Sequence, residues 1–450
     1  MFELEPVALD RLYAAHVADL RARYDAVVDR LGWDAVVLHS GSPLQRSVFD
    51  DQYWPLRPVP HWQHWLPLTE ANAALVLRPN RRPLLVRVSQ QSFWEKPAAP
   101  ESDAFLNEFD LVVVRDVLGT RGHLGPGRVA FVGEDRARAT AWGIEEECTC
   151  PPALLAALDA LRTTKTPYEV GCIAEANRRA RAGHEALRDV FAEGAASELD
   201  LHLRYLQATA QDDWETPYKN IVALGANAAT LHHVAYARAP SRGEVESLLV
   251  DAGATCRGYA SDVTRTWVRG GGARASVFAR IVAAVDAMQV GLCSAVRLGL
   301  AYEELHDRSH REVAAILRDA GLIHGSIDEA VDTGVTRAFF PHGLGHSLGI
   351  QTHDVGCGLR PPKPENPFLR NTTDVARGQV FTIEPGIYFI PQLLEPLRAR
   401  GGGGLVDFEA VDELASLGGV RIEDDLVVVG GESVIRNLTR EQLPSGGGAV

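Results

Sequence analysis

The stretch that decides the fold reads SLLVDAGATCRGYASDVTRTWV and spans residues 247–268. Two runs of apolar and β-branched residues flank a short polar segment, which is the pattern of a β-hairpin. With the turn at residues 256–257, the register sets Asp251 opposite Asp262, and a one-residue shift in the turn would only stagger them. Carboxylates that face each other across a ladder repel, and an apolar strand raises the cost of burying them. We expect a cation between them, although an ion pair of Asp262 with Arg265 explains this pair equally well.

Two further acids lie in segments with strand character. Glu384 interrupts the apolar run VFTIEPGIY at residues 380–388, where the following proline ends the ladder. In GVRIEDDLVVV at residues 419–429, period-2 alternation places Arg421 and Glu423 on one face. The sequence thus predicts acids embedded in strand cores, where an uncompensated charge is costly.

Histidines gather in PHGLGHSLG, residues 341–349, and just beyond it. His342, His346 and His353 fall within twelve residues, and the intervening glycines let the backbone pass close to a bound group. A lone histidine is more often structural than catalytic. Three of them beside four buried acids favour a functional site.

Four carboxylates and one imidazole suit two hard divalent cations. The four negative charges balance two M²⁺ ions, and a bridging hydroxide would serve as the nucleophile. Oxygen-rich ligation favours Mn²⁺, with Co²⁺ and Zn²⁺ as alternatives. A structural Ca²⁺ site is less favoured because histidine is a poor calcium ligand.

Composition narrows the remaining function classes. The chain has 450 residues and 45 Lys+Arg against 59 Asp+Glu, a net charge of −14, which argues against binding nucleic acid or anionic membranes. Its six cysteines show no zinc-finger or redox spacing. The N-terminal residues do not resemble a secretory signal, and no uninterrupted apolar run reaches the length of a bilayer span. We expect a cytoplasmic protein.

The length and the order of patterns predict two domains. Residues 1–160 alternate helical and strand patterns, as a smaller mixed α/β domain does. Residues 161–450 place long helices between strand pairs, which predicts an α+β domain with an antiparallel sheet backed by helices. Glycine clusters at residues 270–272, 401–404 and 446–448 are predicted to be surface loops or tail.

Two competing motifs are weaker. GHSLG, at residues 345–349, fits the nucleophile elbow of serine hydrolases, but that fold needs an acid and then a histidine downstream, and only His353 follows. His306 and His310 stand one helical turn apart, as in zinc proteases, yet Asp307 replaces the expected glutamate. We interpret this pair as solvent-facing or helix-packing.

The strings DAGA with GYASDVTRT, HGLGH and TIEPGIY resemble the pita-bread metallopeptidases, a family that includes methionine aminopeptidase, aminopeptidase P, creatinase and prolidase. Residues 49–57 and 64–68, with TPYKNIV at residues 216–222, resemble the bacterial prolidases and organophosphorus acid anhydrolase within that family. The resemblance covers nearly the whole chain. It implies a C-terminal pita-bread fold preceded by a prolidase-like domain.

The resemblance also implies roles for individual residues. Asp262 and Glu423 would bridge two metal ions, Asp251 would bind one of them, and His346 with Glu384 would complete the other. His342 and His353 would flank the scissile carbonyl, and Glu384 would carry a proton to the leaving nitrogen. Arg370 would grip the C-terminal carboxylate of the substrate with help from Arg421, and Tyr218 and His232 would also contact substrate. The spacing leaves His233 as an alternative to His232.

The implied function is hydrolysis of Xaa-Pro dipeptides by hydroxide attack on the peptide carbonyl, with incidental phosphotriester hydrolysis. The alternatives are an aminopeptidase P acting on longer peptides and a binding module without catalysis. The family also favours a homodimer in which the loop around Trp54 contributes to the partner's site. The sequence does not indicate the preferred Xaa residue.

Overall fold

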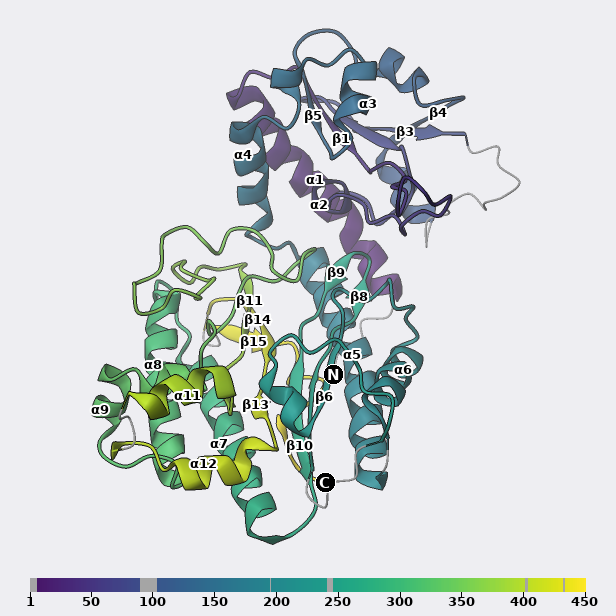
Figure 1. Cartoon of the computed structure of the whole chain (residues 1–450). Helices are drawn as coiled ribbons and strands as arrows, with labels where there is room; N and C mark the ends of the chain where they lie inside the picture. The colour runs from purple at the N-terminus through teal and green to yellow at the C-terminus, as the bar shows by residue number, and fades with distance from the viewer. Residues whose placement is uncertain (1–5, 90–102, 195, 241–245, 401–403, 432–433) are drawn as a thin grey trace. The chain divides into compact units, whose positions relative to one another are not determined.

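The computed structural model describes residues 6–89, 103–194, 196–240, 246–400, 404–431 and 434–450. The chain divides into two compact units, Met1–Gly171 and Cys172–Val450. Figure 1 colours the chain from purple at the N-terminus to yellow at the C-terminus. The sequence set the boundary near residue 160. Residues 161–171, which include the start of helix α5 (Pro167–Glu193), belong to the first unit.

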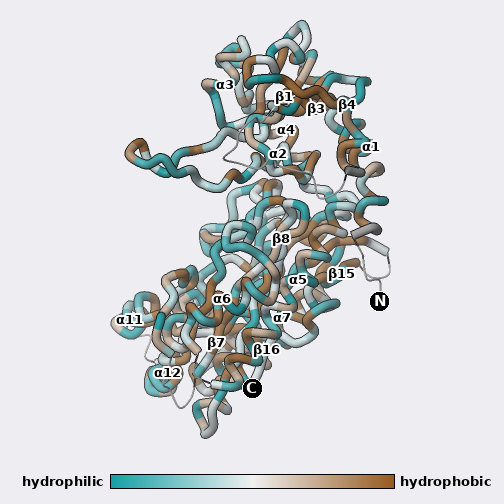
Figure 2. The backbone as a smooth tube through the Cα atoms, turned by 90° about the vertical axis from the view of Figure 1, so that its right-hand side faces the viewer, coloured by the Kyte–Doolittle hydropathy of each residue, from teal (hydrophilic) through white to brown (hydrophobic). Residues whose placement is uncertain are grey.

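The first unit is built on a mixed five-stranded sheet in the order β4-β3-β2-β1-β5. Strand β1 runs antiparallel to β2 and parallel to β5, and β3 runs parallel to β4. Every residue of β1 and β2 is buried, so these apolar runs form the core of the unit. Figure 2 shows hydrophobic residues along β1 and β3. The elements are α1 (Pro6–Arg30), β1 (Ala35–His39), α2 (Pro60–Gln63), β2 (Ala74–Leu77), β3 (Leu84–Val88), η1 (Asp103–Glu108), β4 (Asp110–Val114), η2 (Gly119–His123), β5 (Val129–Val132), α3 (Arg136–Ala141), η3 (Glu146–Cys148) and α4 (Pro152–Arg162).

The second unit contains a four-stranded sheet in the order β16-β10-β7-β6. Strand β7 (Glu246–Asp251) is antiparallel to both β6 (Ile221–Leu224) and β10 (Thr264–Arg269). The predicted glycine tail is instead strand β16 (Gly447–Ala449), parallel to β10. A Cβ atom on Gly447 would lie 1.8 Å from the Thr266 carbonyl oxygen, so the close pairing accepts only glycine. Residues 401–403 of another predicted glycine loop lie outside the described residues.

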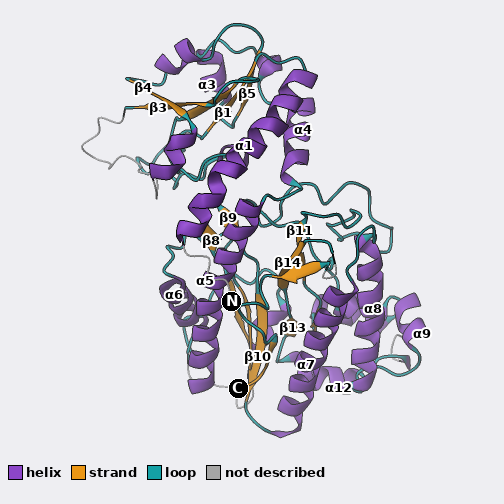
Figure 3. Cartoon of the chain, turned by 180° about the vertical axis from the view of Figure 1, so that it is seen from behind, coloured by secondary structure: helices purple, strands orange, loops and turns teal. Residues whose placement is uncertain are grey.

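Helices cover this sheet on both sides. Figures 1 and 3 show α5 and α6 (Glu198–Thr209) on one side of the strands and α7 (Gly272–Ala295) with α8 (Tyr302–Asp319) on the other. Of the described helices, α7 alone is long and apolar enough to cross a membrane by length and composition. Its side chains Phe278, Ile281, Val285 and Leu292 are buried in the core of the second unit, as in a core helix of a globular protein.

Smaller elements complete the second unit. Strands β11, β14 and β15 form an antiparallel sheet, and β12 pairs with β13. The elements are η4 (Gly225–Ala229), β8 (Thr255–Cys256), β9 (Tyr259–Ala260), α9 (Ile327–Asp332), α10 (Val335–Phe339), β11 (Val380–Ile383), β12 (Gly386–Tyr388), α11 (Pro391–Ala399), α12 (Phe408–Ala415), β13 (Gly419–Arg421), β14 (Asp424–Val428) and β15 (Ile435–Asn437). The predicted α+β architecture is confirmed.

The hairpin register differs from the prediction. The turn between β8 and β9 is formed by Arg257 and Gly258, whose φ angles are +52° and +88°. Two successive positive φ angles are those of a type I′ turn, which matches the twist of paired strands and favours glycine. The turn lies one residue later than predicted, so Asp251 pairs with Thr264 and the predicted pairing with Asp262 is wrong.

Candidate functional site

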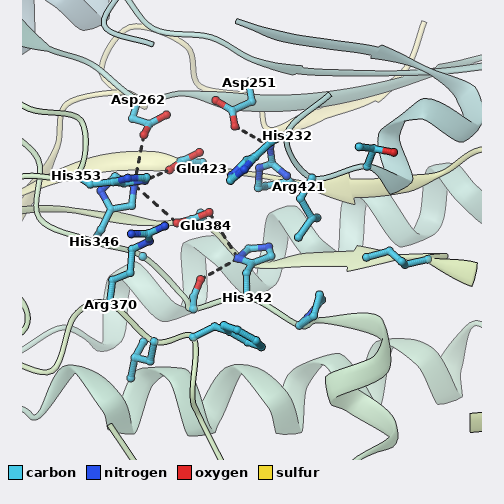
Figure 4. Close-up of a pocket in the computed structure, with 18 of the residues that line it drawn as sticks. His232, Asp251, Asp262, His342, His346, His353, Arg370, Glu384, Arg421 and Glu423 are labelled. Carbon is cyan, nitrogen blue, oxygen red and sulfur yellow. Dashed lines mark hydrogen bonds and ion pairs between the residues drawn. The ribbon is translucent and has the colours of Figure 1, made fainter. Parts of the chain in front are cut away.

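The five predicted metal ligands meet in one cavity of the second unit (Figure 4). Their acids do not lie inside strands, as the sequence suggested, but at strand ends and breaks. A break in the ladder frees the backbone to turn a side chain out of the pleat toward a common centre. Asp251 ends β7, Asp262 precedes β10, Glu384 separates β11 from β12, and Glu423 separates β13 from β14.

His346 is the centre of this cluster. Its Nε2 atom lies 3.3 Å from Asp262 Oδ2, 3.8 Å from Glu384 Oε1 and 3.9 Å from Glu423 Oε1. Its Nδ1 atom lies 3.0 Å from the carbonyl oxygen of Ser347, which can only accept, so Nδ1 carries a hydrogen. That bond fixes the ring and aims Nε2 at the carboxylates, the orientation that a metal-binding histidine needs.

The charge balance around His346 shows what the acids require. Burial lowers the pKa of His346, but Asp262 and Glu384 outweigh it and raise this pKa to about 9. Burial also raises the pKa of Asp262, yet His346 holds that pKa below its usual range. The imidazole thus supplies positive charge among these acids, a role that a bound divalent ion would take over while Nε2 served as a ligand.

The other three carboxylates have too little positive charge near them to offset their burial. Burial raises the pKa of Asp251, brings that of Glu384 to about 7 and raises that of Glu423 well above its usual range. Glu423 Oε1 is buried and has no hydrogen-bond donor among the described residues. Oxygen atoms from Asp262 and Glu423 and a nitrogen from His346 lie within 4.8 Å of one another. Four carboxylates and one imidazole therefore fit divalent cations.

The Tyr218 hydroxyl contacts two of the carboxylates, those of Asp251 and Asp262. Its hydroxyl oxygen lies 2.7 Å from Asp251 Oδ1 and 2.6 Å from Asp262 Oδ1. A phenol has one hydrogen to donate, so the second short contact between oxygens needs another proton or cation. The family resemblance implied that Tyr218 contacts substrate, but this residue is not among those that line the cavity.

A second hydrogen-bonded chain supports His342. Arg421 donates from Nη2 to Asp251 Oδ2 at 2.6 Å and from Nη1 to the Tyr388 hydroxyl at 3.0 Å. That hydroxyl lies 2.8 Å from His342 Nε2, and His342 Nδ1 lies 2.8 Å from the Gly343 carbonyl oxygen. Burial and the Arg421 charge lower the pKa of His342 to about 3, so the ring is neutral. Its Nδ1 atom is also 3.6 Å from Glu384 Oε2.

The remaining predicted residues line a cavity of about 870 Å³, a size typical of small-molecule sites. His353 packs edge-on against His346 with ring centroids 4.4 Å apart, and burial lowers its pKa to about 4. Arg370 and His232 also lie on the wall. His233 instead contacts Glu198, with its Nε2 atom 2.7 Å from Oε2, so His232 is the histidine that faces the cavity.

Sequence reasoning missed several residues of this site. Thr264 donates to Glu423 Oε2 at 2.8 Å, and Asp425 Oδ2 accepts from the backbone N–H of Asp262 at 3.0 Å. Thr264 and Tyr388 stand in the motif strings, but only the three-dimensional pairing reveals their partners. The wall also contains the apolar side chains of Leu231, Phe368, Ile390 and Leu393. No spacing signal identifies these, because they come from separate segments.

Comparison with known proteins agrees with this arrangement. Residues 171–430 match the family model "Metallopeptidase family M24", and residues 11–159 match "Xaa-Pro dipeptidase, N-terminal domain". A Marinobacter nauticus protein named Xaa-Pro dipeptidase is 40% identical over 433 residues, which cover 96% of this chain and 98% of the relative. A Stenotrophomonas maltophilia protein of the same name is 37% identical over 458 residues, with complete coverage of both chains.

Solved structures share the fold. The aminopeptidase PepP of Pseudomonas aeruginosa superposes with a TM-score of 0.74 at 23% identity and covers 95% of each chain. Zinc-substituted aminopeptidase P of E. coli gives a TM-score of 0.72 at 20% identity, with 95% of this chain and 96% of that one covered. With family models and full-length relatives in agreement, this chain belongs to metallopeptidase family M24, whose pita-bread fold it shares.

Proposed function

We propose that this protein is an Xaa-Pro dipeptidase that works with two divalent metal ions. The observation that carries the proposal is the convergence of all five predicted ligands in a cavity whose wall presents Arg370. Full-length relatives named Xaa-Pro dipeptidase support it. Arg370 is exposed and forms no ion pair within the described ranges, so its guanidinium is available to a substrate carboxylate.

The ligand set defines what the cations would do. Asp251, Asp262, His346, Glu384 and Glu423 would hold them, and we propose Mn²⁺ as the native metal because four of these five residues donate oxygen. When bound, the ions supply an activated water molecule as nucleophile and polarise the peptide carbonyl.

The neutral histidines would orient the substrate. His342 and His353 line the cavity, and their lowered pKa values, about 3 and about 4, keep both rings uncharged at neutral pH. An uncharged imidazole can contact the scissile carbonyl without repelling the cations. Glu384 lies between His346 and His342, at 3.8 Å and 3.6 Å, where its carboxylate can carry a proton toward the leaving proline nitrogen.

Arg370 would restrict the enzyme to dipeptides. A guanidinium pairs with a terminal carboxylate through two parallel hydrogen bonds, and a longer peptide places its carboxylate elsewhere. His232 would contact the substrate from another part of the wall. Arg421 would act indirectly, since its Nη2 atom is bonded to Asp251.

The experiment that tests the function is a substrate panel with metal-stripped protein and added Mn²⁺, Co²⁺ or Zn²⁺. The proposal expects hydrolysis of Ala-Pro, highest with Mn²⁺, and little hydrolysis of a tripeptide with proline second. Faster cleavage of the tripeptide would indicate an aminopeptidase P. No hydrolysis with any metal would favour a binding module.

We propose further that the same site hydrolyses phosphotriesters slowly, because an activated water can attack phosphorus as well as carbon. The cavity is large enough for an aryl dialkyl phosphate. Release of p-nitrophenol from a p-nitrophenyl phosphotriester, lost together with peptide hydrolysis on metal removal, is the expected result. Phosphotriester turnover that exceeds Ala-Pro turnover would reverse the assignment of substrate.

A cytoplasmic homodimer is the proposed state of the molecule. The loop around Trp54 exposes Leu44, Val48, Phe49 and Tyr53, an apolar surface that a second copy of the chain would cover. None of the six cysteines, all of which lie in the described ranges, forms a disulfide, which suits a reducing compartment. The net charge of −14 supports neither nucleic acid nor anionic membrane as a partner.

A further inference from the structure

One wall of the cavity is a strap of irregular chain, residues 361–370, which ends at Arg370. Pro367, Phe368 and Leu369 line the cavity together with Arg370. The backbone at the end of the strap passes tightly over Gly343, where a Cβ atom would lie 2.8 Å from the Phe368 carbonyl oxygen and 2.9 Å from Leu369 Cα. The end of the strap therefore packs closely against Gly343, which also lines the cavity.

On its other side the strap is bound to helix α8. Asn366 donates from Nδ2 to Asp307 Oδ1 at 2.9 Å and to Glu303 Oε1 at 3.0 Å. The Lys363 N–H donates to the same Glu303 oxygen at 2.9 Å, and Lys363 Nζ donates to Asp307 Oδ2 at 2.5 Å. Two carboxylates of one helix face thus receive four hydrogen bonds from three donor atoms of the strap, and hydrogen bonds to charged acceptors are the strong ones.

Burial makes these bonds specific. Asn366 is only 3% exposed, so its amide has little access to water. Burial alone would raise the pKa of Asp307, but the bonds from Lys363 and Asn366 lower it below its usual range. Asp307 is therefore ionised, and its carboxylate holds the strap.

The anchor lies one short turn from Arg370. The Leu369 N–H donates to the Asn366 carbonyl oxygen at 3.0 Å, which closes the chain between the anchor and the end of the strap. Arg370 forms no ion pair within the described part of the chain. The position of its guanidinium therefore depends on where the strap holds its backbone. Neighbouring His306 and His310 are 3% and 2% exposed, which confirms the helix-packing interpretation of that motif and leaves Asp307 as its member directed to the strap.

We infer that Asp307 and Asn366 are positioning residues that place Arg370 for the C-terminal carboxylate of the substrate and thereby set the preference for free dipeptides. The inference rests on the proposed function. It adds a purpose to the His306-Asp307-Arg308-Ser309-His310 segment, which takes no part in the metal site.

The test compares Ala-Pro with Ala-Pro amide, which lacks the carboxylate. Asn366→Asp keeps the shape of the side chain but sets a third carboxylate against Asp307 and Glu303. A contact made equally in the ground and transition states changes KM rather than kcat. We expect KM for Ala-Pro to rise about tenfold with kcat within about twofold, and kcat/KM for the amide to stay unchanged.

Two further variants separate positioning from damage. Asp307→Asn added to Asn366→Asp removes part of the repulsion and should recover at least part of the lost Ala-Pro affinity. Glu304→Gln is the matched control, because Glu304 is exposed on the same helix and has no contact with the strap among those described. That control should leave both substrates unaffected.

The outcomes separate a failure of the positioning role from a failure of the proposed function. Equal losses on Ala-Pro and its amide, or no loss on either, would overturn the positioning role while the wild-type activity upheld the proposed function. A wild-type protein inactive on Ala-Pro with every metal would reject the proposed function and this inference with it. If Asn366→Asp lowers the melting temperature strongly, Asp307→Asn alone, which keeps the shape and removes the charge, must show the same split between substrates.

Discussion

Single side chains in this site depend on partners that turn them toward one centre. His346 is aimed by its bond to the Ser347 carbonyl, and Asp262 is held through its backbone by Asp425. The sequence pointed to all five proposed ligands, because four of them lie in motif strings and Glu423 lies in an apolar strand pattern. Tyr388 lies in a motif string and Asp425 follows Glu423 closely, but only their spatial contacts with His342 and Asp262 show what they do.

At Arg370, replacement by alanine should impair the binding of dipeptides selectively. Loss of a bidentate pair with a carboxylate should raise KM for Ala-Pro by about thirtyfold and affect Ala-Pro amide far less. Steady-state kinetics on both substrates measures this. Arg318→Ala, an exposed arginine on helix α8, is the control. Equal losses on the two substrates would remove the carboxylate role from Arg370.

The ends and breaks of the β-strands determine where the acids of the site lie. The sequence predicted long helices between strand pairs in residues 161–450, and α5, α7 and α8 are such helices. It placed the four acids inside strands, whereas the structure sets them at ends and breaks of β7, β10, β11 and β14. An apolar run looks the same whether or not its ladder is interrupted, so only the break beside Glu384, which Pro385 marks, could be predicted. The register was missed for a related reason, since either of two adjacent residue pairs could form the turn.

The loop that carries His346 tolerates no added bulk at Gly345. A Cβ atom there would lie 2.2 Å from the Thr382 carbonyl oxygen and 2.4 Å from the Tyr302 hydroxyl. Gly345→Ala should therefore displace the loop, lower the free energy of unfolding by about 1–3 kcal/mol and reduce Ala-Pro turnover at least ~100-fold. Chemical denaturation and metal analysis measure the two effects.

Gly291→Ala is the matched control within α7, because the nearest atom to its added Cβ is 3.8 Å away, at the end of Arg308. Alanine is a better helix former than glycine, so this variant should be as stable as wild type or more so. Near-normal activity in Gly345→Ala would contradict the tight packing around Gly345, because the loop would then have space for a methyl group.

The whole molecule should lose stability in mild acid. Burial lowers the pKa of His16 and of His39 to about 4, against about 6.5 in an unfolded chain. Below pH 6.5 the unfolded state binds more protons than the folded state, so this contribution is fully present above that pH and is lost as pH falls toward 4. Each histidine should cost on the order of 2 kcal/mol by pH 5.

Urea unfolding at pH 7 and pH 5 measures this loss. His39→Leu provides the comparison, because both ring nitrogens of His39 are buried without hydrogen-bond partners among the described residues. The variant should be more stable at pH 7 by about 1–2 kcal/mol and lose less stability at pH 5. A wild-type protein with the same free energy of unfolding at both pH values would contradict the buried neutral state of these rings.

Five converging side chains are proposed to hold two cations for hydrolysis of Xaa-Pro dipeptides. The most direct measurement titrates metal-stripped protein and its Asp262→Asn variant with Mn²⁺ while Ala-Pro hydrolysis is followed. Wild-type activity should be absent without metal and should saturate at about two ions per chain, and the variant should stay at least ~100-fold slower at saturation, since the amide cannot balance the metal charge. A variant with near-normal turnover in Mn²⁺, or wild-type hydrolysis without any metal, would contradict catalysis by two bound cations.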